Sequence, residues 1–334
     1  MAAALFGLST PFVQRVGQGL GPFTTALFLY LGAALIALVF RKGTEHEARL
    51  RRNDAPRILA MATFGAVIGP VALAWGLQHT SGSGASLMLT LEALFTAIFA
   101  WLLYRESIDK RLMIAMSLLL LGGILLILDQ GSVGRERMLG LLAVLIATIA
   151  WGIDNTLSRG VAERDPSQVI LAKSVLGASA TLVLAYLFGE TMPSVASALT
   201  LTAIGASGYG LSLRAYLLAQ RAFGATRTGS VFAFAPFIGA LGAFLLGDRS
   251  ASWGMALGGT FMLIGILLHL SESHLHEHTH ESLEHEHAHF HDDGHHLHTH
   301  EGPAQDNHSH FHRHEPMFHA HPHAPDAQDR KSVV

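Results

Sequence analysis

Residues 94–103, LFTAIFAWLL, and residues 237–246, FIGALGAFLL, are two apolar runs that align residue by residue at an offset of 143. A second match, at an offset of 145, pairs residues 150–155, AWGIDN, with residues 5–10, LFGLST. Self-similarity at a nearly fixed period is the signature of a duplicated architecture. We therefore predict that the chain contains two copies of one structural unit.

Each predicted copy holds five segments that suit a membrane. A helix needs about 20 mostly apolar residues to cross roughly 30 Å of hydrocarbon. A tenth segment, Met1–Val16, is shorter and is expected to be a clipped first helix. The nine longer segments are Pro22–Phe40, Ile58–Gln78, Ser83–Tyr104, Leu112–Leu128, Met138–Leu157, Val169–Phe188, Leu199–Gln220, Thr228–Gly247 and Ser252–Leu270.

An odd number of helices per copy forces the second copy into the membrane upside down, an arrangement typical of secondary transporters. We therefore predict an all-α polytopic membrane protein of about ten transmembrane helices, arranged as two inverted five-helix repeats. The first repeat is expected at residues 1–128, the second at residues 138–270, and a disordered tail at residues 271–334.

Composition excludes several classes of protein. The chain has no cysteine, which excludes disulfides, iron–sulfur clusters and thiolate zinc sites. The net charge of −3 gives no indication of a nucleic-acid partner. No glycine-rich phosphate loop is present to use ATP. The partners we expect are the lipid bilayer and a small-molecule substrate, and the sequence leaves the oligomeric state open.

Basic residues gather in alternate loops. One set of loops holds 13 of them and the other set holds four, so the richer side is predicted to be cytoplasmic. With an even number of helices, both termini are then cytoplasmic, in the plasma membrane (the inner membrane of a bacterium). The 13 are Arg41, Lys42, Arg49, Arg51, Arg52, Arg57, Arg105, Lys110, Arg111, Arg159, Arg164, Arg221 and Arg227, and the four are Arg15, Arg135, Arg137 and Arg249.

Two motif sets carry a family resemblance. The first is Trp75-Gly76-Leu77-Gln78, then Gly84-Ala85-Ser86, then the run from Leu91-Glu92-Ala93 to Tyr104-Arg105-Glu106; the second is residues 220–227, QRAFGATR, then Ala235-Pro236-Phe237 to Gly247-Asp248. Over residues 1–270 the chain resembles the EamA-type family of the drug/metabolite transporter superfamily. The resemblance implies ten helices, inverted repeats and transport of small metabolites, often outward. The family's proline after the glutamate is Ala93 here, which leaves a helix break in the first copy open.

Charges inside the predicted membrane helices are candidate site residues, because each costs roughly 2.5–3.5 kcal/mol on insertion scales. Glu92 is a candidate proton or substrate-ammonium site, and Arg214 a candidate anchor for a carboxylate; alternatively the two pair for structure alone. Asp154 and Asn155 follow Trp151 and are expected to line a cavity or to cap a helix end. Lys173 lies one turn inside its helix and is expected to extend to the cytoplasmic surface.

The tail is rich in histidine at alternating positions. From residue 271 onward it holds 19 of the 22 histidines. Neutral imidazoles with neighbouring carboxylates suit zinc, nickel, cobalt and copper, so we predict that the tail binds such ions loosely. The predicted ligands are His276, His278, His280, His285, His287, His289 and His291.

Two tail segments, residues 276–280 and 285–289, match the H-E-x-x-H signature of zinc proteases. A run made of histidine and glutamate produces such matches from composition alone, so we predict that the chain is not an enzyme. The leading hypothesis is a secondary transporter, and specifically an exporter, of small organic metabolites, with no required cofactor. The alternatives are a transition-metal exporter, or a membrane-anchored metal sensor that uses the tail.

Overall fold

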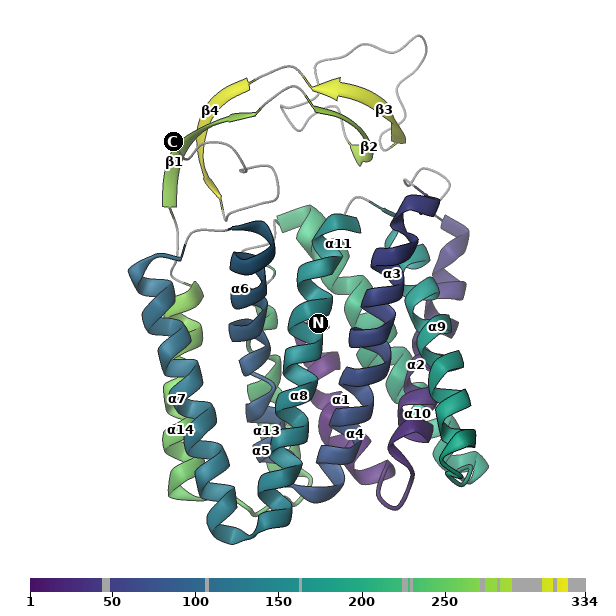
Figure 1. Cartoon of the computed structure of the whole chain (residues 1–334), viewed down its shortest axis with the longest axis vertical. Coiled ribbons are helices and arrows are strands. Elements are labelled where there is room, and N and C mark those ends of the chain that lie inside the picture. The colour runs from purple at the N-terminus through teal and green to yellow at the C-terminus, as the bar shows by residue number, and fades with distance from the viewer. Residues whose placement is uncertain are drawn as a thin grey trace.

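The computed structural model describes residues 1–43, 49–105, 108–161, 164–223, 228, 231–270, 274–280, 283–289, 308–314 and 317–323. Up to residue 270 these described residues form ten helical segments (Figure 1). In order they are α1 (Ala2–Val16); α2 (Pro22–Val39); α3 (Ala55–Met61) with η3 (Ala62–Ile68) and α4 (Gly69–His79); α5 (Gly82–Met88) with α6 (Leu91–Tyr104); α7 (Lys110–Val133); α8 (Arg135–Ser158); α9 (Pro166–Leu187); α10 (Val195–Ile204) with η5 (Gly205–Leu211) and α11 (Ser212–Phe223); α13 (Ala235–Leu245); and α14 (Trp253–Leu270). The short turns η1 (Phe40–Gly43), η2 (Arg52–Asp54) and η4 (Arg159–Val161) flank them.

The predicted all-helical membrane fold is confirmed. Within the described residues, seven segments are long and apolar enough to cross a membrane: Pro22–Val39, Arg52–His79, Gly82–Tyr104, Lys110–Val133, Arg135–Val161, Pro166–Leu187 and Trp253–Leu270. The segments Ala2–Val16, Val195–Phe223 and Ala235–Leu245 complete the ten. Most of residues 224–230, where the ninth helix was expected to begin, lie outside the described residues.

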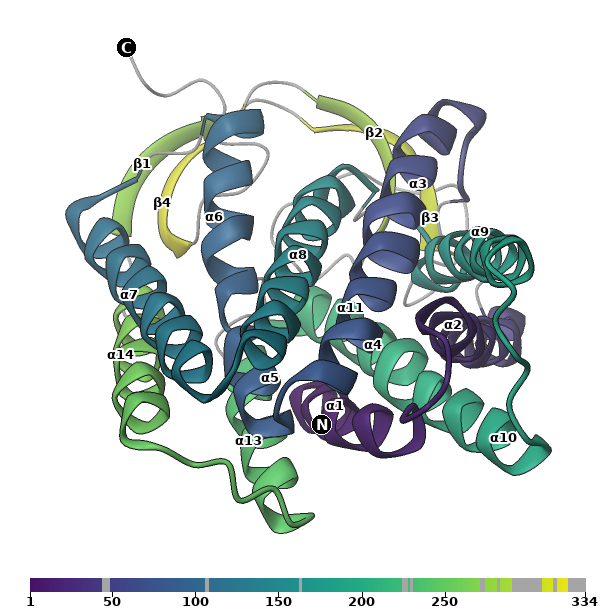
Figure 2. The same ribbon diagram turned by 60° about the horizontal axis from the view of Figure 1, so that its bottom comes forward.

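The duplication is visible in the backbone. Within the third and eighth segments, η3 and η5 are both π-helical turns, and they lie 143 residues apart. Helices that correspond in the two repeats pack against each other, α2 against α9 and α7 against α14 (Figure 2). Two further contacts repeat across the halves, because α1 packs on α13 as α8 packs on α6. These pairings give the bundle the arrangement of two inverted repeats.

The two ends of the bundle are named here by the tail. The tail face is the end at which α2 and α6 finish and α14 leads into residue 271, and the far face is the opposite end. Local signals set where the helices begin: proline occupies the first turn of α2 and of α9, and Asp109 and Asp165 cap α7 and α9. Such residues satisfy or avoid the free N–H groups of a first turn.

A helix break that the sequence left open is present in the first repeat. The fourth segment stops at Met88 and restarts at Leu91, although no proline follows Glu92. The chain makes tight turns there, since Thr90 N donates to Leu87 O (3.0 Å) and Glu92 N donates to Leu89 O (3.0 Å). In the second repeat α13 begins at Ala235, immediately before Pro236. The break therefore belongs to both repeats and does not require proline.

Large apolar side chains cover much of the outside of the bundle, as lipid contact requires. Leu120, Leu121 and Leu128 of α7 and Leu182 and Val183 of α9 are exposed, whereas the buried core is built from residues of both repeats. In water such a surface would favour aggregation, but in a bilayer it faces lipid tails of the same polarity.

The tail was expected to lack order, and the structure describes four strands in it. They are β1 (His274–His280), β2 (Leu283–His289), β3 (His308–His314) and β4 (Met317–His323). β1 pairs with β4 and β2 with β3, both antiparallel, beside the tail face (Figure 1). The other residues from 271 to 334 lie outside the described residues.

Candidate functional site

A cavity with about 740 Å³ of empty space, including its opening, lies between the two repeats. Its walls come from α1, α2 and α6 of the first repeat and from α8, α9, η5 and α11 of the second. Lys173 is seven residues from the tail-face end of α9 and Glu92 about twelve from that of α6, which places them roughly 10–18 Å below the tail face. The site therefore lies between the membrane midplane and the tail face. It is lined by Phe6, Tyr30, Ala33, Glu92, Trp151, Asp154, Asn155, Ile170, Lys173, Ser174, Gly208, Tyr209, Ser212, Leu213, Tyr216 and Phe232.

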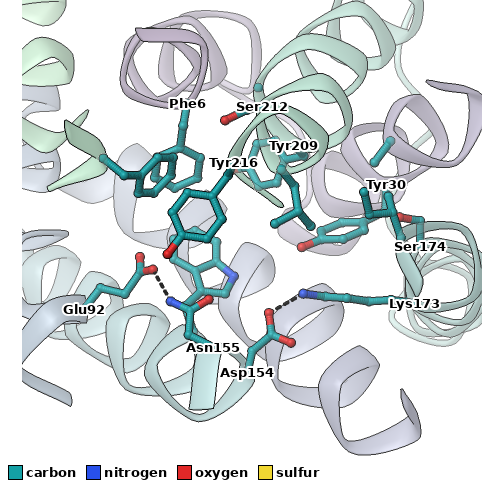
Figure 3. A pocket seen from close by; sticks show the side chains of 16 residues that line it. Phe6, Tyr30, Glu92, Asp154, Asn155, Lys173, Ser174, Tyr209, Ser212 and Tyr216 are labelled. Atoms are coloured by element: carbon teal, nitrogen blue, oxygen red, sulfur yellow. Dashed lines mark hydrogen bonds and ion pairs between the residues drawn. The ribbon is translucent and has the colours of Figure 1, made fainter. Parts of the chain in front are cut away.

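The carboxylate of Glu92 is bound to the second repeat. Asn155 Nδ2 donates to Glu92 Oε1 at 2.6 Å, across the α6–α8 contact (Figure 3). The helix break places Glu92 in the first turn of α6. A negative charge is favoured there, because the free N–H groups and the helix dipole are positive at a helix start. Four of the sequence-predicted residues, Glu92, Trp151, Asp154 and Asn155, line this one cavity.

A buried ion pair lies beside Glu92. Lys173 Nζ donates to Asp154 Oδ2, and both residues are only 6 % exposed. The expectation that Lys173 extends to the cytoplasmic surface is therefore wrong. The reason is tertiary: α9 packs against η3 and presents this residue to α8 inside the bundle, where a carboxylate is available, so the ammonium pairs with it.

The ion pair rests on a glycine of the π-helical turn. A Cβ atom on Gly65 would lie 2.2 Å from Asp154 Oδ2 and 2.6 Å from Lys173 Nζ, so only glycine leaves room for the pair. The carbonyl oxygen of Gly65 accepts hydrogen bonds from the Tyr30 hydroxyl and from Trp151 Nε1, the latter at 3.0 Å. π-helical turns are frequent at functional sites. Here the carbonyl group of Gly65 binds two helices, α2 and α8, and α9 packs against the same turn.

Aromatic rings form the remaining walls of the cavity. The Phe6 ring lies edge-on to Trp151 and to Tyr209, with centroid distances of 5.9 and 6.0 Å. Tyr216 lies edge-on to Phe232 at 4.9 Å. In Figure 3 the Glu92–Asn155 hydrogen bond and the Asp154–Lys173 ion pair lie on one side of the cavity, and Phe6 and Tyr209 lie on the other. The sequence prediction missed these rings; a tyrosine between two glycines, Gly208-Tyr209-Gly210, was the signal that could have pointed to them.

Arg214 takes a different position from the other sequence-predicted residues. Its Nη1 atom donates to Ser167 Oγ at 2.7 Å, and its guanidinium lies over the Phe40 ring at 4.6 Å. It is not among the residues that line the cavity. The alternative prediction, a pair with Glu92, is not seen either, because Glu92 is bound to Asn155.

Polar contacts join the two repeats at both ends of the bundle. At the far face, Glu190 accepts hydrogen bonds from the backbone of Phe23 (3.2 Å) and Thr24 (2.7 Å) at the start of α2. Also there, Asp248 accepts from the backbone N–H of Ser83 in α5 at 2.8 Å. At the tail face, Arg164 pairs with Asp54 at 3.0 Å. The cavity is thus enclosed between two sets of contacts, each of which crosses from one repeat to the other.

The predicted metal ligands lie in the tail. His276, His278 and His280 fall in β1, and His285, His287 and His289 fall in β2, whereas His291 lies outside the described residues. The strand register places histidine opposite histidine at six positions: 274 with 323, 276 with 321 and 278 with 319 in one sheet, and 285 with 312, 287 with 310 and 289 with 308 in the other.

Comparison with known proteins agrees with this architecture. A family model described as the EamA-like transporter family matches residues 1–128 and 138–271. An uncharacterized transporter of Methanothermobacter thermautotrophicus is 27 % identical over 287 residues, which cover 80 % of this chain and 83 % of that protein. The uncharacterized transporter YyaM of Bacillus subtilis is 25 % identical over 70 % of this chain and 78 % of its own length. A solved structure, described only as the crystal structure of a protein, shares the fold with a TM-score of 0.57 and 18 % identity, and covers 79 % of this chain and 93 % of its own.

Proposed function

Because the chain belongs to the EamA-like transporter family, we propose that it exports a small organic metabolite by alternating access, as a secondary transporter. It is a multi-pass membrane transporter and not an enzyme. The observation that carries the proposal is the polar cavity at the interface of the two repeats, in which Asp154 and Lys173 are buried and Glu92 is partly buried. Ionisable groups at this depth are retained where they bind or move something, because each is costly to place there.

We expect the contacts at the two ends of the bundle to open in turn, as alternating access requires. If the repeats rock against each other, the Glu190 and Asp248 contacts open at the far face while the Arg164–Asp54 pair keeps the tail face closed. In the opposite state the Arg164–Asp54 pair opens and the far-face contacts stay closed. Coupling to a proton or ion gradient would act through Glu92.

We propose further that the transporter lies in the plasma membrane with both termini and the tail in the cytoplasm. The support is the distribution of basic residues in the sequence, 13 in one set of loops and four in the other; the described residues of the richer set lie towards the tail face. Export then means that the substrate enters the cavity from the tail face, which the cavity lies nearer to.

The tail is proposed to bind transition-metal ions such as Zn²⁺, Ni²⁺, Co²⁺ or Cu²⁺. The six cross-strand histidine positions support this second role, since imidazole is a preferred ligand of these ions. A metal exporter remains the alternative function. The cavity favours the organic solute, because among the described residues that line it there are two carboxylates but no histidine.

The test is transport by the purified full-length chain in proteoliposomes loaded with a mixture of cytosolic metabolites, with efflux identified by mass spectrometry. We expect saturable efflux of an organic solute that falls at least tenfold in Glu92→Gln, while the matched variant Glu136→Gln, an exposed carboxylate at the far-face start of α8, is unaffected. Removal of residues 271–334 should abolish Ni²⁺ binding without lowering this efflux. Efflux of Zn²⁺ or Ni²⁺ in place of any organic solute would support the alternative function instead.

A further inference from the structure

The charges in the cavity do not balance. Two carboxylates, Glu92 and Asp154, and one ammonium, Lys173, line it, so the formal balance of these three ionised groups is minus one. Arg214, the nearest further cation that the sequence suggested, is bound to Ser167 away from the cavity. A cavity with an excess negative charge and low-dielectric walls attracts a cation.

Asp154 has an oxygen atom available for a ligand. Its Oδ2 accepts from Lys173, but its Oδ1 is buried and has no hydrogen-bond partner among the described residues. Asn155, the neighbouring amide, is already bound to Glu92. A buried carboxylate oxygen without a donor is unfavourable, so the site calls for a group that carries an N–H or O–H.

The fold itself does not need this ion pair. The repeat that aligns residues 150–155 with 5–10 places Ser9 where the second repeat has Asp154, and the same offset places Phe28 where it has Lys173. The contact is otherwise preserved, because a Cβ on Gly208 of η5 would lie 2.5 Å from Ser9 Cβ, as one on Gly65 of η3 would meet Asp154. One half of the bundle therefore builds the same junction with Ser9 and without an ion pair, so this packing does not by itself require the charges.

The remaining walls suit the apolar body of a cation. Phe6, Tyr30, Trp151, Tyr209 and Tyr216 present rings to the cavity, and the faces of aromatic rings attract ammonium groups. A carboxylate ligand, by contrast, would have to take Lys173 from Asp154 and would leave the Asp154 carboxylate without its cation.

We propose that the substrate, in the transport function proposed above on which this inference rests, is a protonated organic amine with an apolar body, and that its ammonium binds Asp154 in exchange for Lys173. In the empty cavity Lys173 occupies the place of the substrate's ammonium on Asp154. When the amine arrives, it donates to Asp154, including Oδ1, and Lys173 is displaced. The tethered ammonium of Lys173 thus neutralises Asp154 between transport cycles.

Binding to the purified full-length chain, measured by calorimetry, tests the ligand class. The probes are butylamine, 2-phenylethylamine and tryptamine, with 2-phenylethanol, the N,N,N-trimethyl derivative of phenylethylamine, and phenylalanine as comparisons. We expect at least one primary amine to bind at least tenfold tighter than the alcohol and the trimethyl derivative, which lack the charge and the N–H respectively. No binding of any amine, or tenfold tighter binding of phenylalanine than of phenylethylamine, overturns the proposal.

Variants of the ion pair test the exchange. Lys173→Met should lose thermal stability, regain it when an amine is added, and bind that amine about tenfold tighter or better, because the internal competitor is gone. Asp154→Asn should not bind amines. The double variant Asp154→Asn/Lys173→Met keeps the cavity uncharged at this point; it should fold even if Lys173→Met does not, and should show no stabilisation by amines.

The matched control is Arg164→Met, which breaks the ion pair with Asp54 outside the cavity. It should not be stabilised by amines, and if it is, the rescue of Lys173→Met is unspecific and the exchange is overturned. The outcomes also separate this inference from the proposed function. If the vesicles show efflux of an organic solute but the protein binds no amine, the transport function stands and the inference about the substrate is overturned. If amines bind at Asp154 but no solute leaves the vesicles, the ligand class stands and the transport function is overturned.

Discussion

Gly65→Ala is the substitution that most directly tests how the site is built. Gly65 lies in the π-helical turn η3, and the ion pair between Asp154 and Lys173 lies directly over it. The new Cβ atom would be 2.2 Å from Asp154 Oδ2 and 2.6 Å from Lys173 Nζ, where real Cβ contacts essentially never fall below 3.0 Å. The carboxylate would have to move by 3.0 − 2.2 = 0.8 Å and the ammonium by 3.0 − 2.6 = 0.4 Å, away from the groups that they contact.

The size of the effect follows from the burial of the pair. Loss of one partner of a buried ion pair costs about 3–5 kcal/mol, because the other charge is left uncompensated. Alanine is a better helix former than glycine by up to ~1 kcal/mol, which offsets part of this loss. Gly65→Ala displaces both partners and removes neither, so this cost is an upper limit, and we expect the free energy of unfolding to fall by about 1–4 kcal/mol. Efflux should fall more than tenfold, since the change also displaces Asp154 in the cavity.

The assay is thermal unfolding of the full-length chain in detergent, together with efflux from proteoliposomes. Gly259→Ala in α14 is the matched control: its Cβ would meet Leu87 at an ordinary 3.4 Å, so it should be neutral or stabilise by up to ~1 kcal/mol. If Gly65→Ala is as stable and as active as Gly259→Ala, the ion pair does not depend on the glycine and the reasoning about the site is refuted.

Three further predictions concern the far-face contacts of Glu190 and Asp248 and the helix break before α6. Glu190→Ala removes the acceptor for two backbone N–H groups of α2 and should lower stability by about 1–2 kcal/mol in thermal unfolding, whereas no loss would mean that this far-face contact is unimportant. Burial alone would raise the pKa of Asp248, but hydrogen bonds from Ser250 and Ser83 outweigh it and hold the pKa below its ordinary value. The ionised Asp248 therefore stabilises the folded protein above pH ~4, the pKa of an unfolded aspartate, and this stabilisation is lost as the pH falls through the lower pKa of the folded state. The difference in melting temperature between wild type and Asp248→Asn should accordingly disappear at acidic pH. A difference that stays constant with pH would contradict this. Ala93→Pro should cost no more than about 1 kcal/mol, because it falls in the first turn of α6, whereas Ala100→Pro in the helix interior should cost about 3 kcal/mol or more; equal costs would refute the helix break.

The sequence was sufficient for the membrane helices and for the duplication. A helix in lipid must satisfy its own backbone hydrogen bonds and needs a long apolar run, and both requirements are local and therefore visible in the sequence. For the same reason Glu92 and Asp154 could be identified as candidates, since a charge in an apolar run stands out without knowledge of its surroundings.

The partners of these charges could not be read from the sequence. Lys173 was expected at the surface, because it lies one turn inside the predicted helix Val169–Phe188. In the structure α9 begins earlier, at Pro166, and its packing against η3 directs Lys173 to the interior. Arg214, an equally conspicuous charge, lies beside Ser167 and Phe40 instead of in the cavity. The break before Leu91 was also hidden, since tight turns produce it without proline.

The sequence by itself determined the apolar runs, such as residues 94–103 and 237–246, their repetition, and the charges that interrupt other runs. What only the tertiary structure decided is which of those charges meet. In one repeat α8 packs against the π-helical turn η3 and brings Asp154 to Lys173 beside Gly65. In the other, α1 packs against η5 and brings Ser9 to Gly208. Hydropathy is a property of single segments, whereas a binding site is a property of several segments that pack together.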